Sequence, residues 1–163
     1  FSQTPVGTFI SEADMFRLSA DTSNGANADI TANLERVDDA TFSKIGTGMT
    51  ESSGIFTFPS TGLYQVICNP GVIGVSDNRN SVITNVSSDS GSNYDEVADA
   101  SGGGGGSSFD LNNVYSNAFV NVTNASTFRV KFTTTSFGVS CRLVGDTNKT
   151  RTSFSFIKLG ASQ

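Results

Sequence analysis

The strongest constraint on the fold of this chain is a repeated alternation of apolar and polar residues in short runs. The clearest run extends from Phe128 to Phe132, where three apolar side chains alternate with Arg129 and Lys131. Because successive side chains of a β-strand point to opposite faces, this run predicts a strand that buries Phe128, Val130 and Phe132. Similar runs occupy residues 15–20, 55–58, 63–68, 81–86, 114–122 and 154–159, and a weaker one lies near residues 34–45.

Clusters of Gly, Asn, Ser and Asp separate these runs, as at Asn24-Gly25, and a Pro-containing turn lies between Pro59 and Gly62. Such residues favour turns, whereas residues of high helix propensity are scarce. About eight strands joined by polar turns predict an all-β fold, an antiparallel sandwich or barrel. A length of 163 residues corresponds to one domain. We expect an N-terminal arm at residues 1–12 and a single domain at residues 13–163.

The segment from residue 87 to residue 108 is polar and contains five consecutive glycines, Gly102 to Gly106. A phosphate-binding loop would need a following Lys-Ser/Thr pair and a helix, and the sequence provides neither. Because glycine has high backbone entropy and no side chain to pack, we expect residues 87–108 to form a long, mobile, Gly-rich surface loop.

Four acidic residues, Asp89, Asp95, Glu96 and Asp99, precede the glycines. Calcium takes several oxygen ligands from flexible loops, but the spacing of these residues matches no EF-hand pattern. A solvated acidic loop is therefore favoured over an ion site, and no metal-binding residue is assigned.

The remaining carboxylates give no convincing acid–base pair. Asp38 and Asp39 are adjacent, so in a strand they would point to opposite faces. Asp14, Asp21 and Asp29 are interpreted as turn residues. Since the chain contains no histidine, Ser-His-Asp and Cys-His nucleophile pairs are excluded. We predict a protein without catalytic residues or a cofactor, that is, not an enzyme.

The two cysteines, Cys68 and Cys141, lie in or beside strand-forming segments. Each is expected to be a small core residue rather than a reactive thiol. A disulfide between the two is the alternative.

The charge of the chain limits its partners. Lys and Arg number 10 against 15 Asp and Glu, which gives a net charge of −5 at pH 7. An acidic chain is a poor partner for nucleic acid and for an anionic membrane. No apolar run reaches about 18 residues, so no membrane insertion is expected. The chain begins at Phe1 rather than at Met, and we expect a processed protein or a domain of a longer one.

One stretch is more specific than the alternation. Residues 53–66 read SGIFTFPSTGLYQV, which resembles the signature of C1q and tumour-necrosis-factor-like jelly rolls. In that family a strand of the form Gly-x-Phe-x-x-Pro turns into Gly-x-Tyr-x-Val/Phe. Residues 35–42, 124–130 and 152–160 look like further parts of the same pattern, so the resemblance covers residues 13–160. It implies a two-sheet antiparallel jelly-roll sandwich.

A narrower likeness is to C1q-like domains at the ends of tailed-phage structural proteins, and residues 145–152 and 156–160 carry it. It implies a homotrimer on the virion surface that contacts other virion proteins and decorates a capsid or forms part of a fibre or appendage. A knob that binds a host receptor or glycan is the alternative, with Tyr94 and Tyr115 as candidate stacking faces. The absence of paired carboxylates argues against a depolymerase, and the absence of a disulfide network argues against a secreted cytokine-like module.

The alternation also selects residues for a subunit contact. Within residues 114–122, the even-numbered positions are mostly apolar and fit the core. The odd-numbered positions, which point to the opposite face, include Tyr115 and Phe119. In the last run, Ile157 and Leu159 share the face opposite to the two phenylalanines. Because exposed apolar patches commonly mark interfaces, we predict that these four residues form the trimer contact. A bulge that shifts the register and buries them within one chain is the alternative.

Overall fold

The computed structural model describes residues 10–74, 79–103 and 110–163. The regular elements of these residues are β-strands, namely β1 (Ala13–Leu18), β2 (Leu34–Arg36), β3 (Thr50–Ser52), β4 (Ile55–Thr57), β5 (Gly62–Asn69), β6 (Gly71–Gly74), β7 (Arg79–Ser87), β8 (Asp95–Gly103), β9 (Asp110–Asn113), β10 (Ser116–Val122), β11 (Arg129–Thr135), β12 (Arg142–Leu143) and β13 (Ser153–Gly160). Within the described part of the chain, no helix is long and apolar enough to cross a membrane.

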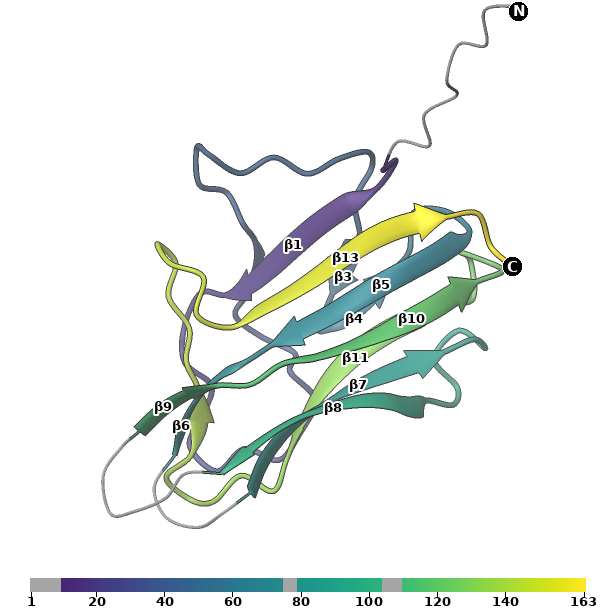
Figure 1. Cartoon of the computed structure of the whole chain (residues 1–163). Coiled ribbons are helices and arrows are strands. Elements are labelled where there is room, and N and C mark those ends of the chain that lie inside the picture. The colour runs from purple at the N-terminus through teal and green to yellow at the C-terminus, as the bar shows by residue number, and fades with distance from the viewer. Residues whose placement is uncertain (1–9, 75–78, 104–109) are drawn as a thin grey trace, which may run out of the picture.

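The strands form a sandwich of two five-stranded sheets, and all pairings are antiparallel (Figure 1). The front sheet has the order β10-β5-β13-β1-β2, and the back sheet has the order β3-β4-β11-β7-β8. A third sheet, β12-β6-β9, lies at one end of the sandwich (Figure 1). The prediction of an all-β, two-sheet antiparallel sandwich is confirmed.

The alternation in the sequence is visible in the burial of the strands. Along β5 every second residue is buried, and the same holds for Val130, Phe132 and Thr134 of β11. Arg129 and Lys131 are only partly buried, as predicted for the opposite face. On β13, Phe154 and Phe156 point into the core. These inward rows supply the apolar interior that both sheets share.

The centre of that interior is a cluster of aromatic rings around Phe56. The Phe56 ring on β4 of the back sheet lies 5.1 Å from that of Phe16 and 5.0 Å from that of Phe156, which are both on the front sheet. It also contacts Phe132 edge-to-face at 5.8 Å, and Phe132 stacks on Phe154 at 4.2 Å. Such ring pairs add stabilisation beyond the area that they bury, so the cluster joins the two sheets.

The segment 53–66 carries the chain from one sheet to the other. It supplies β4 to the back sheet and β5 to the front sheet, and the proline turn between them therefore crosses the sandwich instead of closing a hairpin. At Gly62, a Cβ atom would lie 2.7 Å from the carbonyl oxygen of Gly160. Only glycine fits this approach of β5 to the end of β13.

One arginine is completely buried at the margin of the front sheet. The guanidinium of Arg17 on β1 donates to Glu35 at 2.7 Å, to Asp38 at 2.8 Å and to Asp39 at 2.6 Å. It also donates to the carbonyl oxygen of Thr147. The hydrogen bond to Glu35 raises the pKa of Arg17 while burial opposes that rise. A buried charge needs such partners because its desolvation is costly.

This cluster corrects two expectations about carboxylates. Asp38 and Asp39 do not point to opposite faces, because β2 ends at Arg36 and both residues follow in a loop that turns toward Arg17. Asp14 is not a turn residue, since it lies within β1, buried, and accepts hydrogen bonds from Nε and Nη2 of the Arg36 guanidinium. Asp38 and Asp39 thus both serve as ion-pair partners of the buried Arg17.

Two further expectations about elements were wrong. The weak run near residues 34–45 forms a strand only as far as Arg36, with a separate bridge between Ile45 and Ala13. The expected loop 87–108 contains β8, whose residues pair with β7 along most of its length. Cross-strand hydrogen bonding therefore overrides the low strand propensity of its Asp, Ser and Gly residues. Residues 104–109 and, at the expected N-terminal arm, residues 1–9 lie outside the described residues.

Replacement of Phe132 by Ala should lower the free energy of unfolding by about 3–5 kcal/mol, because it removes a buried ring that contacts both Phe56 and Phe154. Urea denaturation followed by circular dichroism measures the effect. Val97→Ala, at an exposed position on β8, is the control and should change stability by less than about 0.5 kcal/mol. Equal stability of Phe132→Ala and the parent would contradict the assigned core face.

Candidate functional site

The candidate site is the outer face of the front sheet, meaning the face turned away from the back sheet. The strand register places Phe119 of β10, Gln65 of β5, Ile157 of β13 and Ala13 of β1 in one row across four strands. The residues of the next row are Asn117, Ile67, Ser155 and Met15. Because partners in an antiparallel pair project to the same side, these side chains form one continuous surface.

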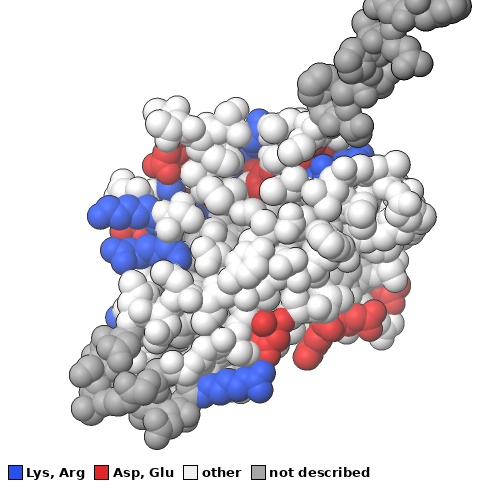
Figure 2. All heavy atoms as spheres, viewed as in Figure 1, with Lys and Arg blue, Asp and Glu red and all other residues white. Residues whose placement is uncertain are grey.

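This surface carries no charge over β10, β5 and β13. The one charged residue in these three strands is Lys158. Lys158 pairs with the buried Tyr64 and therefore lies on the other side of the sheet, where its Nζ donates to Ser60 Oγ at 3.2 Å. Figure 2 shows the result as a broad uncharged area over these strands, with charged residues toward its borders.

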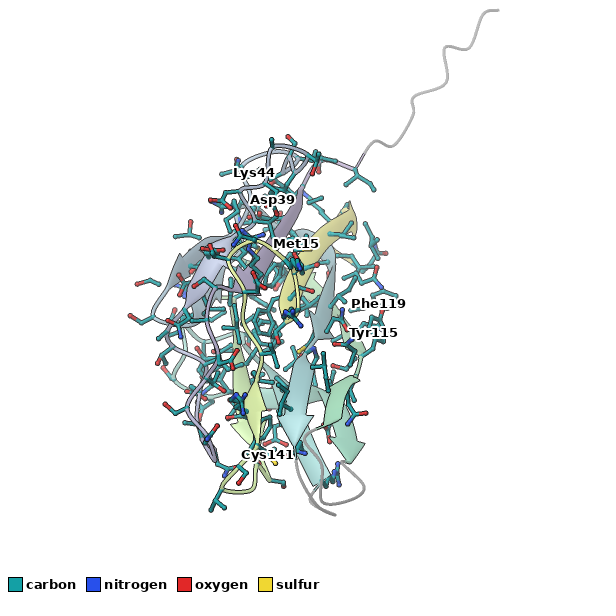
Figure 3. The ribbon with its side chains drawn as sticks, turned by 90° about the vertical axis from the view of Figure 1, so that its left-hand side faces the viewer. Met15, Asp39, Lys44, Tyr115, Phe119 and Cys141 are labelled. Atoms are coloured by element: carbon teal, nitrogen blue, oxygen red, sulfur yellow. The ribbon has the colours of Figure 1, made fainter. Side chains whose placement is uncertain are left out.

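Large apolar side chains are exposed on or beside this surface. Phe119 is 67% exposed, Tyr115 57% and Leu159 45%, while Ile157 is partly buried. Figure 3 shows Phe119 and Tyr115 on the same side, turned away from the sandwich. The register of β13 does shift between Lys158 and Gly160, but this bulge leaves Leu159 exposed. Tyr115, Phe119 and Leu159 are therefore not buried within one chain, and the assignment of the four residues to a trimer contact stays a prediction.

Gln65 was not among the predicted site residues. Its parity with Leu63 and Ile67 in the run 63–68 is the sequence signal that places it on the outer face. Its neighbours Phe119 and Ile157 come from strands far along the chain, so only the register brings the three residues together.

The outer face of the back sheet differs, because its polar groups pair with one another. Lys131 of β11 donates to Asp29 at 2.9 Å and lies 4.4 Å from the centre of the Tyr94 ring. Thr133 donates to the other oxygen of Asp29 at 2.6 Å. Burial would raise the pKa of Asp29, but the hydrogen bonds from Thr133 and Lys131 outweigh it and hold this pKa below its ordinary value. Tyr94 is thus already covered and is a poor stacking face for a sugar.

The acidic residues around β8 do not form an ion site. Asp89 accepts hydrogen bonds from the backbone N–H of Asn93, from its side chain and from Ser87, and these lower the pKa of Asp89 to about 2. Asp99 pairs with Arg79 at 2.6 Å. Among the described residues no group of three or more Asp, Glu or Cys side chains is placed to hold a metal ion.

Both cysteines are buried and unbonded to each other. Burial raises the pKa of the Cys68 thiol far above its ordinary value, which keeps it protonated and unreactive. The interpretation of Cys68 and Cys141 as small core residues is confirmed, and the disulfide alternative is wrong.

No protein-family model matches the sequence, and no curated protein sequence is significantly similar to it. Solved structures do match. Eiger TNF from S. frugiperda matches 95% of this chain and 96% of its own, with 15% sequence identity and a TM-score of 0.70. The globular domain of zebrafish complement 1qA protein matches 93% of this chain and 99% of its own, with 13% identity and a TM-score of 0.57. The fold is the C1q/TNF-like jelly roll.

A third similar structure is the PRD1 vertex protein P5, which matches 93% of this chain and 99% of its own, with 17% identity and a TM-score of 0.53. At such identities the likeness extends to the C1q/TNF-like fold alone, because one fold carries many functions. The function must be argued from the surface of this chain.

Acid should weaken the fold through carboxylates such as Asp29 and Asp21, whose pKa values are lowered in the folded state. For such groups the stabilisation is present above the unfolded pKa and is lost as the pH falls through the folded pKa. We expect constant stability from pH 7 to about pH 5 and a decline below about pH 4. Asp29→Asn should reduce that decline in urea titrations, whereas Val97→Ala on β8, which removes no titrating group, should leave it unchanged. Identical acid profiles for the parent and Asp29→Asn would contradict the pairing.

Proposed function

We propose that this protein is a non-enzymatic homotrimeric module of a virion surface, which decorates a phage capsid or forms part of a fibre or appendage. The observation that carries the proposal is the uncharged outer face of the front sheet, with Phe119 exposed at its β10 edge. A module of this kind works by contact, and it needs neither a cofactor nor a metal.

The physical case for self-association rests on charge and exposed apolar area. Copies of a chain of net charge −5 repel one another at most surfaces. They can approach without that penalty at the uncharged face, where contact also removes Phe119 and Ile157 from water. Closed symmetry then favours a ring in which equivalent surfaces meet around one axis. The resemblance to C1q and TNF-like domains supports three as the number of copies.

The placement on a virion rests on two likenesses. Residues 145–152 and 156–160 resemble the C1q-like domains of tailed-phage structural proteins. The structural similarity to the PRD1 vertex protein P5 supports the same assignment. We propose that the trimer binds other virion proteins and is located at the virion surface.

A receptor- or glycan-binding knob is the second candidate function. The exposed ring of Tyr115 favours it, since aromatic rings stack on sugar faces. The covered ring of Tyr94 counts against it, because Lys131 already occupies one face of that ring. A glycan array probed with the assembled trimer separates the two candidates: binding to defined glycans would favour the knob.

The parent protein should sediment as a trimer at about 10 µM, a concentration at which interfaces of standard size are populated. The double variant Phe119→Asp with Ile157→Asp should sediment as a folded monomer, since it places six carboxylates in one contact. Val139→Asp, which is on the end of the sandwich at a 90% exposed position, is the matched control and should stay trimeric. A monomeric parent would end the trimer proposal, and trimers of the double variant would end the residue assignment.

Immunogold labelling of purified virions tests the location. Regular labelling of the capsid or of an appendage is the expected result. Label confined to infected cells and absent from intact particles would contradict the virion assignment while leaving the trimer proposal intact.

A further inference from the structure

Gln65 lies at the centre of the uncharged face. It is in the middle of the row formed by Phe119, Ile157 and Ala13, and Leu63 and Ile67 precede and follow it on the same face of β5. Its side chain is partly buried by these apolar neighbours. Among the described residues its amide has no hydrogen-bond partner. The side chains directly beside Gln65, across the strands and along β5, are therefore apolar.

The two amides of β10 on this face differ from Gln65, because one is hydrogen-bonded and the other lies at the sheet edge. Asn121 donates to the carbonyl oxygen of Gln163 at 2.8 Å and accepts from the backbone N–H of Gln163 at 2.9 Å. Asn117 is exposed on β10, the edge strand of the sheet, where water can reach it. Gln65 on β5 is further inward and is the amide that a second copy would cover.

Coverage by an apolar surface would leave the Gln65 amide without water and without a partner, which is costly. A primary amide offers both donors and an acceptor, so identical amides can satisfy one another. Around a three-fold axis, each Nε2–H can donate to the Oε1 of the next copy, and three such bonds close a ring. A polar residue buried in an otherwise apolar contact is known to fix register and number of subunits.

We infer that Gln65 of each subunit hydrogen-bonds to Gln65 of its neighbours at the centre of the trimer, so that this amide specifies the self-association. The inference rests on the proposed trimer and adds the residue through which the copies recognise one another. The partner of this surface is therefore a second and a third copy of this chain.

Gln65→Glu tests the inference with little change in shape. At pH 7.5 three carboxylates would meet at the axis, and like charges in contact should weaken association by about 100-fold or more. At about pH 4.5 the crowded carboxyls should be protonated and the trimer should return. Val97→Glu on β8 makes a larger change at the back sheet and should be trimeric at both pH values, as should the parent. Circular dichroism verifies the fold of each variant.

Sedimentation of an equimolar mixture gives the second measurement. Gln65→Lys alone should also be monomeric at pH 7.5, and mixing it with Gln65→Glu should produce mixed assemblies, because opposite charges then meet. Trimeric Gln65→Glu at pH 7.5, or no assembly in the mixture, would overturn the role of Gln65 while a trimeric parent preserved the proposed function. A monomeric parent would overturn both.

Discussion

The aromatic cluster around Phe56 is the interaction on which the rest of the structure depends. Phe56 comes from the back sheet and contacts Phe16 and Phe156 of the front sheet at centroid distances near 5 Å. On both sheets, the strands of this cluster therefore point one alternate set of side chains inward, toward the same rings. Because strand side chains alternate strictly, this commitment also decides which residues must face outward on every strand of the cluster. The character of the two outer faces is thus a consequence of how the core is built.

The outward side chains of the two sheets differ in whether they find partners within the chain. On the outer face of the back sheet, Asp29 pairs with Lys131 and accepts from Thr133, so these three polar groups are satisfied within the chain. On the front sheet the outward residues of β5, β10 and β13 are apolar residues, amides or serines, and Phe119 is 67% exposed. Water is a poor partner for such a surface. This difference supports the proposal that the copies meet through the front sheet.

The sequence predicted the inward rows well, because alternation over five or more residues depends only on local order. It identified β5, β11 and β13 and the exposure of Phe119 and Tyr115. The sequence did not predict the features that depend on contacts between residues far apart in the chain. Nothing local marks Asp95 to Gly103 as a strand, since their pairing with β7 supplies the hydrogen bonds. The partners of Arg17 lie 18 to 130 residues away, so no spacing pattern reveals that cluster.

The same limit applies to the candidate site. Parity alone assigns Gln65 to the outer face, as it does for each odd-numbered residue of the run. Gln65 becomes a candidate interface residue only through the cross-strand register, which places Phe119 on one side of it and Ile157 on the other. This register depends on the pairing of strands that lie about fifty to ninety residues apart in the chain. No rule that reads the local sequence predicts such a pairing.

Arg17 sets the boundary of the uncharged face. It shares the outward parity of Ala13 and Met15 on β1, so an exposed guanidinium there would extend charge into the surface. Instead Glu35, Asp38, Asp39 and the carbonyl of Thr147 enclose it. The outer face of the front sheet is thereby divided into a covered, ionic margin at β1 and β2 and an open, uncharged region over β13, β5 and β10. The proposed self-association uses this open region, and Gln65 lies near its middle.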